Sequence, residues 1–208
     1  MIGKVVPFKK LINPKGLFFP PWIKERHMSR VPSQYTAANR YPFHDTFLRK
    51  NASQIKVFAD VGASFLLGAP TTIDAKKALG PNSTVYATDI RHISGQEKAK
   101  LEKEGIATLT HSIVKSPLPY VCDAIRLANV SIHLQPKERR EALKNCWKSL
   151  REHGYLIGAT AIPIRPFREY NFAFVLRKEG ANFVLVESTL QPATLLDDTL
   201  FRMLNDPL

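Results

Sequence analysis

Short apolar segments alternate with amphipathic, helix-like segments between residues 55 and 160. The run IKVFADV (55–61) is short and mostly apolar, as expected for a strand covered on both faces of a sheet. Proline near the start and glycine after the end bound the helix-like segments. This order predicts an α/β fold with a doubly wound, mainly parallel sheet and helices on both faces. We expect strands at 55–61, 84–88, 106–110, 123–128 and 155–160, and helices at 43–50, 70–78, 94–104 and 136–152.

The C-terminal part admits two interpretations. The segments FAFVL (172–176) and FVLVE (183–187) can form a hairpin around RKEGAN. The alternative is a helix that ends at Gly180 and is followed by a single strand. Because β-branched and aromatic residues dominate both segments, the hairpin is favoured.

Charge is concentrated at the N-terminus. The 208-residue chain has a net charge of +12, and residues 1–50 hold ten basic residues against two acidic ones, which places +8 there. Six of the 15 prolines and eight of the 20 aromatic residues lie in the same quarter. An organelle leader is richer in serine and arginine, so we prefer an ordered arm. We predict a basic, Pro- and aromatic-rich, irregular arm or lid over 1–50 and the α/β domain over 51–208.

Composition excludes several classes of protein. No stretch approaches the roughly 18 apolar residues that a membrane-spanning helix requires, so we expect no membrane association. The two cysteines, Cys122 and Cys146, are too few for a disulfide scaffold or a cysteine-rich zinc module. Their apolar surroundings predict buried thiols in a reducing compartment, and hence a cytoplasmic protein. The six histidines show no metal-ligand spacing, so no metal site is predicted.

The turn after the first strand of the α/β region carries the candidate chemistry. Asp60 ends that strand, and the small residues Gly62, Ala63 and Ser64 follow it. In a doubly wound sheet this turn is where nucleotide-like ligands bind, and Asp89, at the end of the next strand, can accept hydrogen bonds from ribose hydroxyls. A dinucleotide fingerprint would require G-x-G-x-x-G, and Ser64 stands in place of its second glycine. The alternative is that both residues are structural: Asp60 would then accept hydrogen bonds from nearby backbone amides, and Asp89 would be an acidic residue in the turn after the strand.

Residues 55–160 resemble the class I S-adenosylmethionine-dependent methyltransferases, a Rossmann-like family with a seven-stranded type of sheet. The resemblance rests on D-V-G-A-S (60–64), Asp89, D-A-I-R-L-A-N-V (123–130) with H-L (133–134), the helix holding Trp147, and G-Y-L (154–156). It implies S-adenosylmethionine as cofactor, held at its methionine part by the turn and by Asp60, directly or through water. The resemblance further implies that Asp89 binds the ribose and that Ile90 packs on the adenine.

The resemblance extends to later loops and to the arm. It places Ser112 and Ile113 after the third strand near the adenine, and Asn129 at the ligand-binding edge after the fourth. His133 is the candidate catalytic residue, because its loop should face the methyl group, although histidines in such places are more often structural. In this family the chain before the first strand often covers the pocket, and the candidates for that role are Tyr35, Arg40, Tyr41 and Phe43.

The predicted function is therefore methyl transfer from S-adenosylmethionine to a small anionic or aromatic acceptor, with RNA as a possible substrate. Displacement at a sulfonium requires mainly alignment and desolvation, so the lack of an obvious acid–base pair does not contradict it. The alternative is a non-catalytic protein of the same fold that binds nucleic acid or a protein partner through its basic arm.

Overall fold

The structure is a computed structural model that describes residues 5–7, 38–128, 130, 134–165 and 168–192. Strands and helices alternate as the sequence predicts, and a three-residue 3-10 turn, Phe65–Leu67, lies between the first parallel strand and its helix. The helices are α2 (Pro42–Lys50), α3 (Pro70–Leu79), α4 (Gly95–Lys103) and α5 (Pro136–Ser149). The strands are β1 (Val5–Pro7), β2 (Val57–Val61), β3 (Thr84–Asp89), β4 (Ile106–Thr110), β5 (Cys122–Ala128), β6 (Leu150–Arg165), β7 (Arg168–Glu179) and β8 (Asn182–Pro192).

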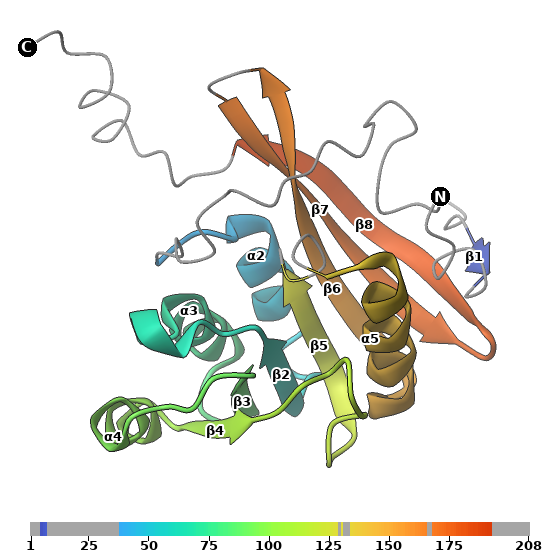
Figure 1. Cartoon of the computed structure of the whole chain (residues 1–208). Helices are drawn as coiled ribbons and strands as arrows, with labels where there is room; N and C mark the ends of the chain where they lie inside the picture. The colour runs from blue at the N-terminus through green and yellow to red at the C-terminus, as the bar shows by residue number, and fades with distance from the viewer. Residues whose placement is uncertain (1–4, 8–37, 129, 131–133, 166–167, 193–208) are drawn as a thin grey trace, which may run out of the picture.

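The sheet is mixed. Its order among the described residues is β1-β8-β7-β6-β5-β2-β3-β4, and the five strands from β6 to β4 are parallel (Figure 1). The expected mainly parallel, seven-stranded type of sheet is therefore right for the part from β6 to the β4 edge. β7, β8 and β1 join antiparallel, which makes eight described strands. For β7 and β8 the cause is the two-residue link before each strand, because so short a link cannot carry the chain back to start a parallel neighbour.

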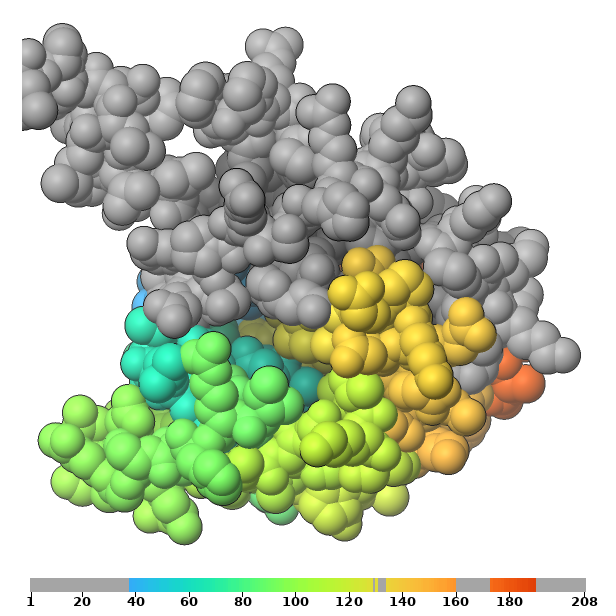
Figure 2. Space-filling view, in the orientation of Figure 1, coloured from blue at the N-terminus to red at the C-terminus, as the bar shows by residue number. Residues whose placement is uncertain are grey.

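Helices cover both faces of the sheet, as predicted. Alternate residues of β2 point to opposite sides: Phe58 packs in a core cluster with α2 and α3, whereas Ala59 belongs to a second cluster beneath α5. Both residues are fully buried. In the space-filling view α4 (green) lies at one side of the described body and α5 (gold) at the other (Figure 2).

Local signals place the helix starts. Pro70 and Pro136 stand in the first turns of α3 and α5, where a missing N–H costs nothing. The Gln135 N–H donates to the Glu138 carboxylate at 2.8 Å, and the Ser94 hydroxyl accepts the Glu97 N–H at the start of α4. The helix expected over 136–152 ends at Ser149, because Leu150 is already extended and pairs with Cys122 in the sheet.

The C-terminal hairpin is confirmed, with strands longer than the sequence indicates. β7 and β8 pair antiparallel from Tyr170–Pro192 to Glu179–Asn182, around a turn that contains Gly180 with φ +53°. The rival helix is absent, since residues 172–179 are extended. Parts of the expected arm also belong to the body: β1 pairs with β8, and α2 buries Phe47 and Leu48. Within the described residues, no helix has the length and apolarity needed to cross a bilayer.

Candidate functional site

The order of the strands reverses between β2 and β5, and we use the word crevice for the edge of the sheet outside the carboxyl ends of these two strands. From β2 the chain moves outward to β3 and β4, then crosses over to β5 on the other side of β2. In open α/β sheets ligands bind at this reversal, outside the carboxyl ends of the strands. The loop at 62–69 follows β2 and Val130 follows β5, so both segments border the crevice.

The loop at 62–69 is held by backbone hydrogen bonds and by unusual dihedral angles. The amides of Gly62 and Ala63 both donate to the Thr88 carbonyl, at 2.7 and 3.0 Å. Gly62 has φ +78°, which glycine adopts without strain. Ser64 and Ala69, with φ of +59° and +49°, adopt the left-handed conformation at a steric cost. The loop therefore has a defined, partly strained shape.

Asp89 joins this loop to the end of β3. Its Oδ2 accepts the Ser64 N–H at 3.0 Å, and its Oδ1 accepts the Arg91 N–H at 3.0 Å. A carboxylate has about four acceptor positions, so two remain for other donors. The carboxylate is half-buried, and the neighbouring Ile90 is 70% exposed. The structure thus joins Ser64 to Asp89 and leaves Ile90 exposed beside them, and the binding of a cofactor by these residues stays a prediction.

Val130 covers the glycine at the start of the loop. A Cβ built on Gly62 would lie 2.4 Å from a methyl carbon of Val130. The close approach to Gly62 that the sequence assigned to a ligand is therefore made by a side chain from the end of β5. Any ligand at the α-carbon of Gly62 requires Val130 to adopt another position.

The segment after β4 contributes less than expected. The His111 N–H donates to the Asp89 carbonyl, which ties this segment to the end of β3. Ser112 is half-buried, and its carbonyl accepts the amides of Lys115 and Ser116. Ile113 is 3% exposed in the core cluster beneath α5, so its side chain serves packing.

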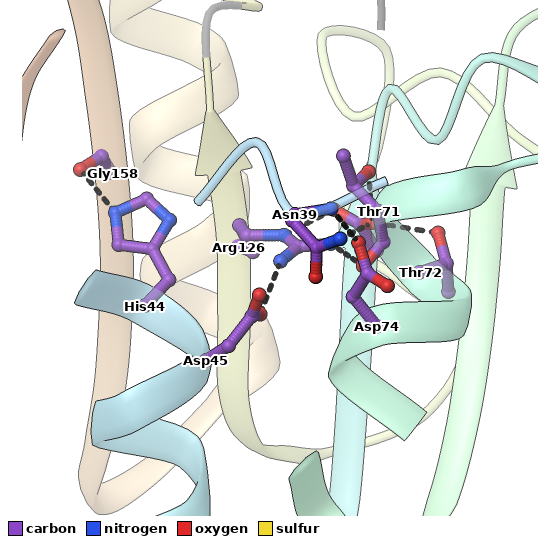
Figure 3. Close-up of polar contacts among 9 residues, drawn as sticks. Asn39, His44, Asp45, Thr71, Thr72, Asp74, Arg126 and Gly158 are labelled. Carbon is purple, nitrogen blue, oxygen red and sulfur yellow. Dashed lines mark hydrogen bonds and ion pairs between the residues drawn. The ribbon is translucent and has the colours of Figure 1, made fainter. Parts of the chain in front are cut away.

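Asp60 belongs to a buried polar cluster on the α2–α3 face, and its partners Thr71, Thr72 and Arg126 are drawn in Figure 3. Its Oδ1 accepts Arg126 Nε–H at 2.9 Å, and its Oδ2 accepts the second donor of the guanidinium and the Thr72 hydroxyl. Asp60 and Arg126 are register partners on the parallel strands β2 and β5, so their side chains emerge side by side. These partners are all groups of the chain itself, and the expected contact of Asp60 with a cofactor stays a prediction.

Arg126 is the centre of this cluster. Its side chain is fully buried, donates to the Thr71 carbonyl at 2.6 Å and lies 3.5 Å from the Asp45 carboxylate of α2. The rings of Tyr41 and Phe58 lie 5.4 and 5.6 Å from the guanidinium. Burial is the largest single effect and opposes the charge, but Asp60, Asp45 and Tyr41 together outweigh it and raise the pKa of Arg126.

Two titratable groups of α2 border this cluster. The Nε2–H of His44 donates to the Gly158 carbonyl at 3.0 Å, and this contact favours the neutral tautomer with the proton on Nε2. Burial, and to a lesser extent the charge of Arg126, lowers the pKa of His44 to about 3. Burial raises the pKa of Asp45 to about 6, although Arg126 opposes that shift. His44 is therefore neutral near pH 7, and Asp45 titrates near pH 6.

The expected lid residues lie partly inside this cluster. Tyr41 is buried between Arg126 and the imidazole of His44, and the guanidinium of Arg40 lies 5.5 Å from its ring. Phe43 is half-buried against the core. These contacts are packing contacts, so a substrate role for the three residues stays a prediction. Tyr35, Asn129 and His133 lie outside the described residues.

Sequence reasoning missed the role of Arg126, although a signal was present. Arg126 is the only basic residue in the strand CDAIRLA (122–128), which is otherwise apolar after Asp123. A charge in a strand covered on both faces requires an opposite charge beside it. The order of the strands identifies that partner as Asp60, and the sequence does not contain this order. In the described part of the chain, no three His, Cys, Asp or Glu side chains converge as metal ligands.

The sequence matches no protein-family model and no curated protein. Among solved structures, the chain is similar to the N-methyltransferase NodS from Bradyrhizobium japonicum in complex with S-adenosyl-L-homocysteine. The identity is 16%, the TM-score is 0.45, and the match covers 73% of this chain and 70% of that one. An O-methyltransferase family protein from Burkholderia thailandensis gives 10% identity, a TM-score of 0.48 and coverage of 61% and 41%. For a protein-L-isoaspartate O-methyltransferase the identity is 14%, the TM-score is 0.47, and the match covers 72% of this chain and 45% of that one.

The chain spans less than half the length of the last two structures. Because the TM-scores and identities of all three are low, these similarities do not indicate the activity of the chain.

Proposed function

We propose that this chain is an S-adenosylmethionine-dependent methyltransferase. The observation that carries the proposal is the joining of Asp89 to the Gly62–Ser64 turn at the reversal of the strand order. That position in a doubly wound sheet suits a nucleoside, with an acid for the ribose hydroxyls. The resemblance of residues 55–160 to class I methyltransferases supports the same assignment.

The residues at the crevice fit the nucleoside part of this cofactor. Asp89 keeps free acceptor positions after its two backbone contacts, which suits two ribose hydroxyls. Ile90, 70% exposed beside it, offers an apolar surface for an adenine ring. Toward the methionine part, Val130 covers Gly62 and would have to rotate away.

The bound cofactor supplies a methyl group on a good leaving group. The task left to the chain is to align the acceptor and exclude water. The loop at 62–69 serves alignment, because backbone hydrogen bonds fix its start on β3. The apolar side chains of Leu66 and Leu67, 55% and 43% exposed on the 3-10 turn, are positioned to exclude water from a ligand at this edge.

The acceptor is proposed from charge alone. The excess of +8 over residues 1–50 favours an anionic acceptor, and most of these residues lie outside the described ranges. A small anionic or aromatic molecule, with RNA as the polymeric variant, stays our proposal. Cytoplasmic location stays a prediction from the buried thiols.

Calorimetry with S-adenosylhomocysteine tests the proposal. Asp89→Asn removes one acceptor and should weaken binding by more than about tenfold, the worth of a charge-assisted hydrogen bond. A cleaner pair is Ile90→Ala and Val121→Ala, which truncate two similarly exposed residues, 70% and 62%, at opposite edges of the sheet. Only Ile90→Ala should weaken binding. Val130→Ala should tighten it, because it uncovers Gly62.

Two results would contradict the proposal. The first is no heat of binding at millimolar ligand, and the second is equal binding by the Ile90 and Val121 variants. If the ligand failed to bind while RNA bound with a steep salt dependence, the non-catalytic alternative would replace the enzyme.

A further inference from the structure

We infer that Arg126 is a positioning residue that fastens both ends of the loop between Asp60 and Thr71. This inference rests on the proposed function for its ligand, since the loop borders the proposed cofactor crevice. Its contacts are independent of any ligand. Arg126 does not border the crevice itself, because its side chain is fully buried on the α2–α3 face.

The two ends of the loop meet at one guanidinium. Asp60 precedes the loop, and its carboxylate accepts two donors of Arg126. Thr71 follows the loop in the first turn of α3, and its carbonyl accepts from the same guanidinium at 2.6 Å. The Thr72 hydroxyl closes the arrangement by donating to the Asp60 carboxylate at 2.6 Å. The ten residues between Asp60 and Thr71 are therefore held as a closed loop.

Only arginine suits this place. Its planar fork presents five N–H donors, which can serve a carboxylate and a carbonyl together, whereas lysine has three donors on one atom. The remaining terminal nitrogen faces the Asp45 carboxylate at 3.5 Å, which connects α2 to the same centre. α2 is the last part of the basic arm, so one side chain joins that helix, two strands and the start of α3.

The shape of the loop explains why fastening is needed. Ser64 and Ala69 hold left-handed dihedral angles that non-glycine residues avoid, and such strain persists only where the surroundings enforce it. Leu66 and Leu67 between them are exposed, so core packing holds this turn only through the neighbouring residues Ala63, Phe65 and Ala69. Ends that move apart would release the strain and displace Ser64 from Asp89.

Hydrogen exchange of the full chain tests this directly. The reporters are amides of the loop with defined acceptors, those of Gly62, Ser64 and Gly68. Thr72→Val removes one hydrogen bond to a carboxylate and should speed their exchange about tenfold, at the low end of the free energy that such a bond contributes. Arg126→Lys should speed it more than about tenfold. Both effects should exceed any change at the amides of the β7–β8 hairpin.

A second ion pair provides the matched control. Arg151 Nε lies 2.8 Å from Asp123, whose other oxygen accepts the amides of Lys56 and Val57 at the opposite edge of the sheet. Arg151→Lys is the same chemical change away from the loop, and loop exchange should stay at the wild-type rate. Binding of S-adenosylhomocysteine should weaken in the order wild type, Thr72→Val, Arg126→Lys, and remain unchanged in Arg151→Lys.

The outcomes separate the two proposals. If wild type binds no S-adenosylhomocysteine but loop exchange responds as stated, the proposed function fails and Arg126 still fastens the loop. If wild type binds and loop exchange in Thr72→Val and Arg126→Lys equals that of Arg151→Lys, the positioning role is overturned. Should Arg126→Lys fail to fold, Thr72→Val alone decides the question.

Discussion

Replacing Asp45 by asparagine should make the stability of the protein depend on pH in a new way. Asp45 lies on α2 with 9% of its surface exposed, near Arg126 and among the negative charges of Asp60 and Asp74. Burial raises its pKa from 3.8 to about 6. Its carboxyl binds a proton more tightly in the folded chain, so the folded state gains stability from it below about pH 4. That gain is lost as pH rises through about 6.

The magnitude follows from the two pKa values. The shift from 3.8 to about 6 corresponds to roughly 3 kcal/mol across the whole range, at about 1.36 kcal/mol per pKa unit. The titration curves of Asp45 in the folded and unfolded chain differ enough between pH 7 and pH 4.5 to account for about 2 kcal/mol of this total. The free energy of unfolding of Asp45→Asn minus that of wild type should therefore be about 2 kcal/mol lower at pH 4.5 than at pH 7.

His44 would mask this effect if wild type were measured alone. Its pKa falls from 6.5 to about 3 on folding, so the stability that neutral His44 contributes is present above pH 6.5 and declines as pH falls toward 3. Between about pH 4 and pH 6 this loss opposes the gain from Asp45. The comparison of Asp45→Asn with wild type removes the contribution of His44, because both proteins contain it.

Urea unfolding of both proteins at pH 7 and pH 4.5 provides the measurement. With a slope of about 2 kcal/mol per molar urea, the difference between the two midpoints should change by about 1 M. The carboxyl carbon signal of Asp45 should titrate near pH 6 in an NMR experiment. A midpoint difference that is the same at both pH values, together with titration of Asp45 near pH 4, would refute the reasoning.

Three further predictions concern packing, strain and reactivity. Gly158→Ala should lower the free energy of unfolding by about 1–3 kcal/mol, measured by thermal unfolding, because the new Cβ would lie 2.1 Å from the Phe174 ring. The double variant Gly158→Ala with Phe174→Leu should recover part of this loss. Ser64→Gly should stabilise the protein by about 1 kcal/mol, since φ of +59° suits glycine, and a lower melting temperature would contradict this. Cys122 and Cys146 are buried, and burial raises the pKa of Cys122 to about 12. A thiol reagent at pH 8 should therefore label neither in the folded protein and both after unfolding.

Local patterns account for the elements that were predicted well. Proline at the start of α3 and α5 and glycine after α3 place the limits of helices through backbone chemistry within a few residues. The β-branched and aromatic content of 172–187 favours the hairpin, which the structure confirms. The end of α5 and the lengths of β6 to β8 were predicted less well, because pairing with neighbouring strands decides where an extended segment begins and ends.

Some positions in the candidate site could likewise be inferred from the sequence, and others could not. Asp89, Ile90 and the Gly62–Ser64 turn follow strands in the sequence, and the carboxyl ends of parallel strands meet at one edge, so their proximity could be inferred. The position of Val130 over Gly62 could not, because β5 becomes the neighbour of β2 only through the order of the strands. The burial of Ile113 beneath α5 is likewise a tertiary contact.

Arg126 shows the physical reason most clearly. The sequence places one charge in an apolar strand, and elementary electrostatics requires a partner for it. The identity of the partner depends on which strand lies beside β5 and on the register that sets Asp60 opposite Arg126. Element types and turns arise from interactions within a few residues, and the sequence alone determines them here. The pairing of buried charges arises between segments 66 residues apart, and only the packed sheet decides it.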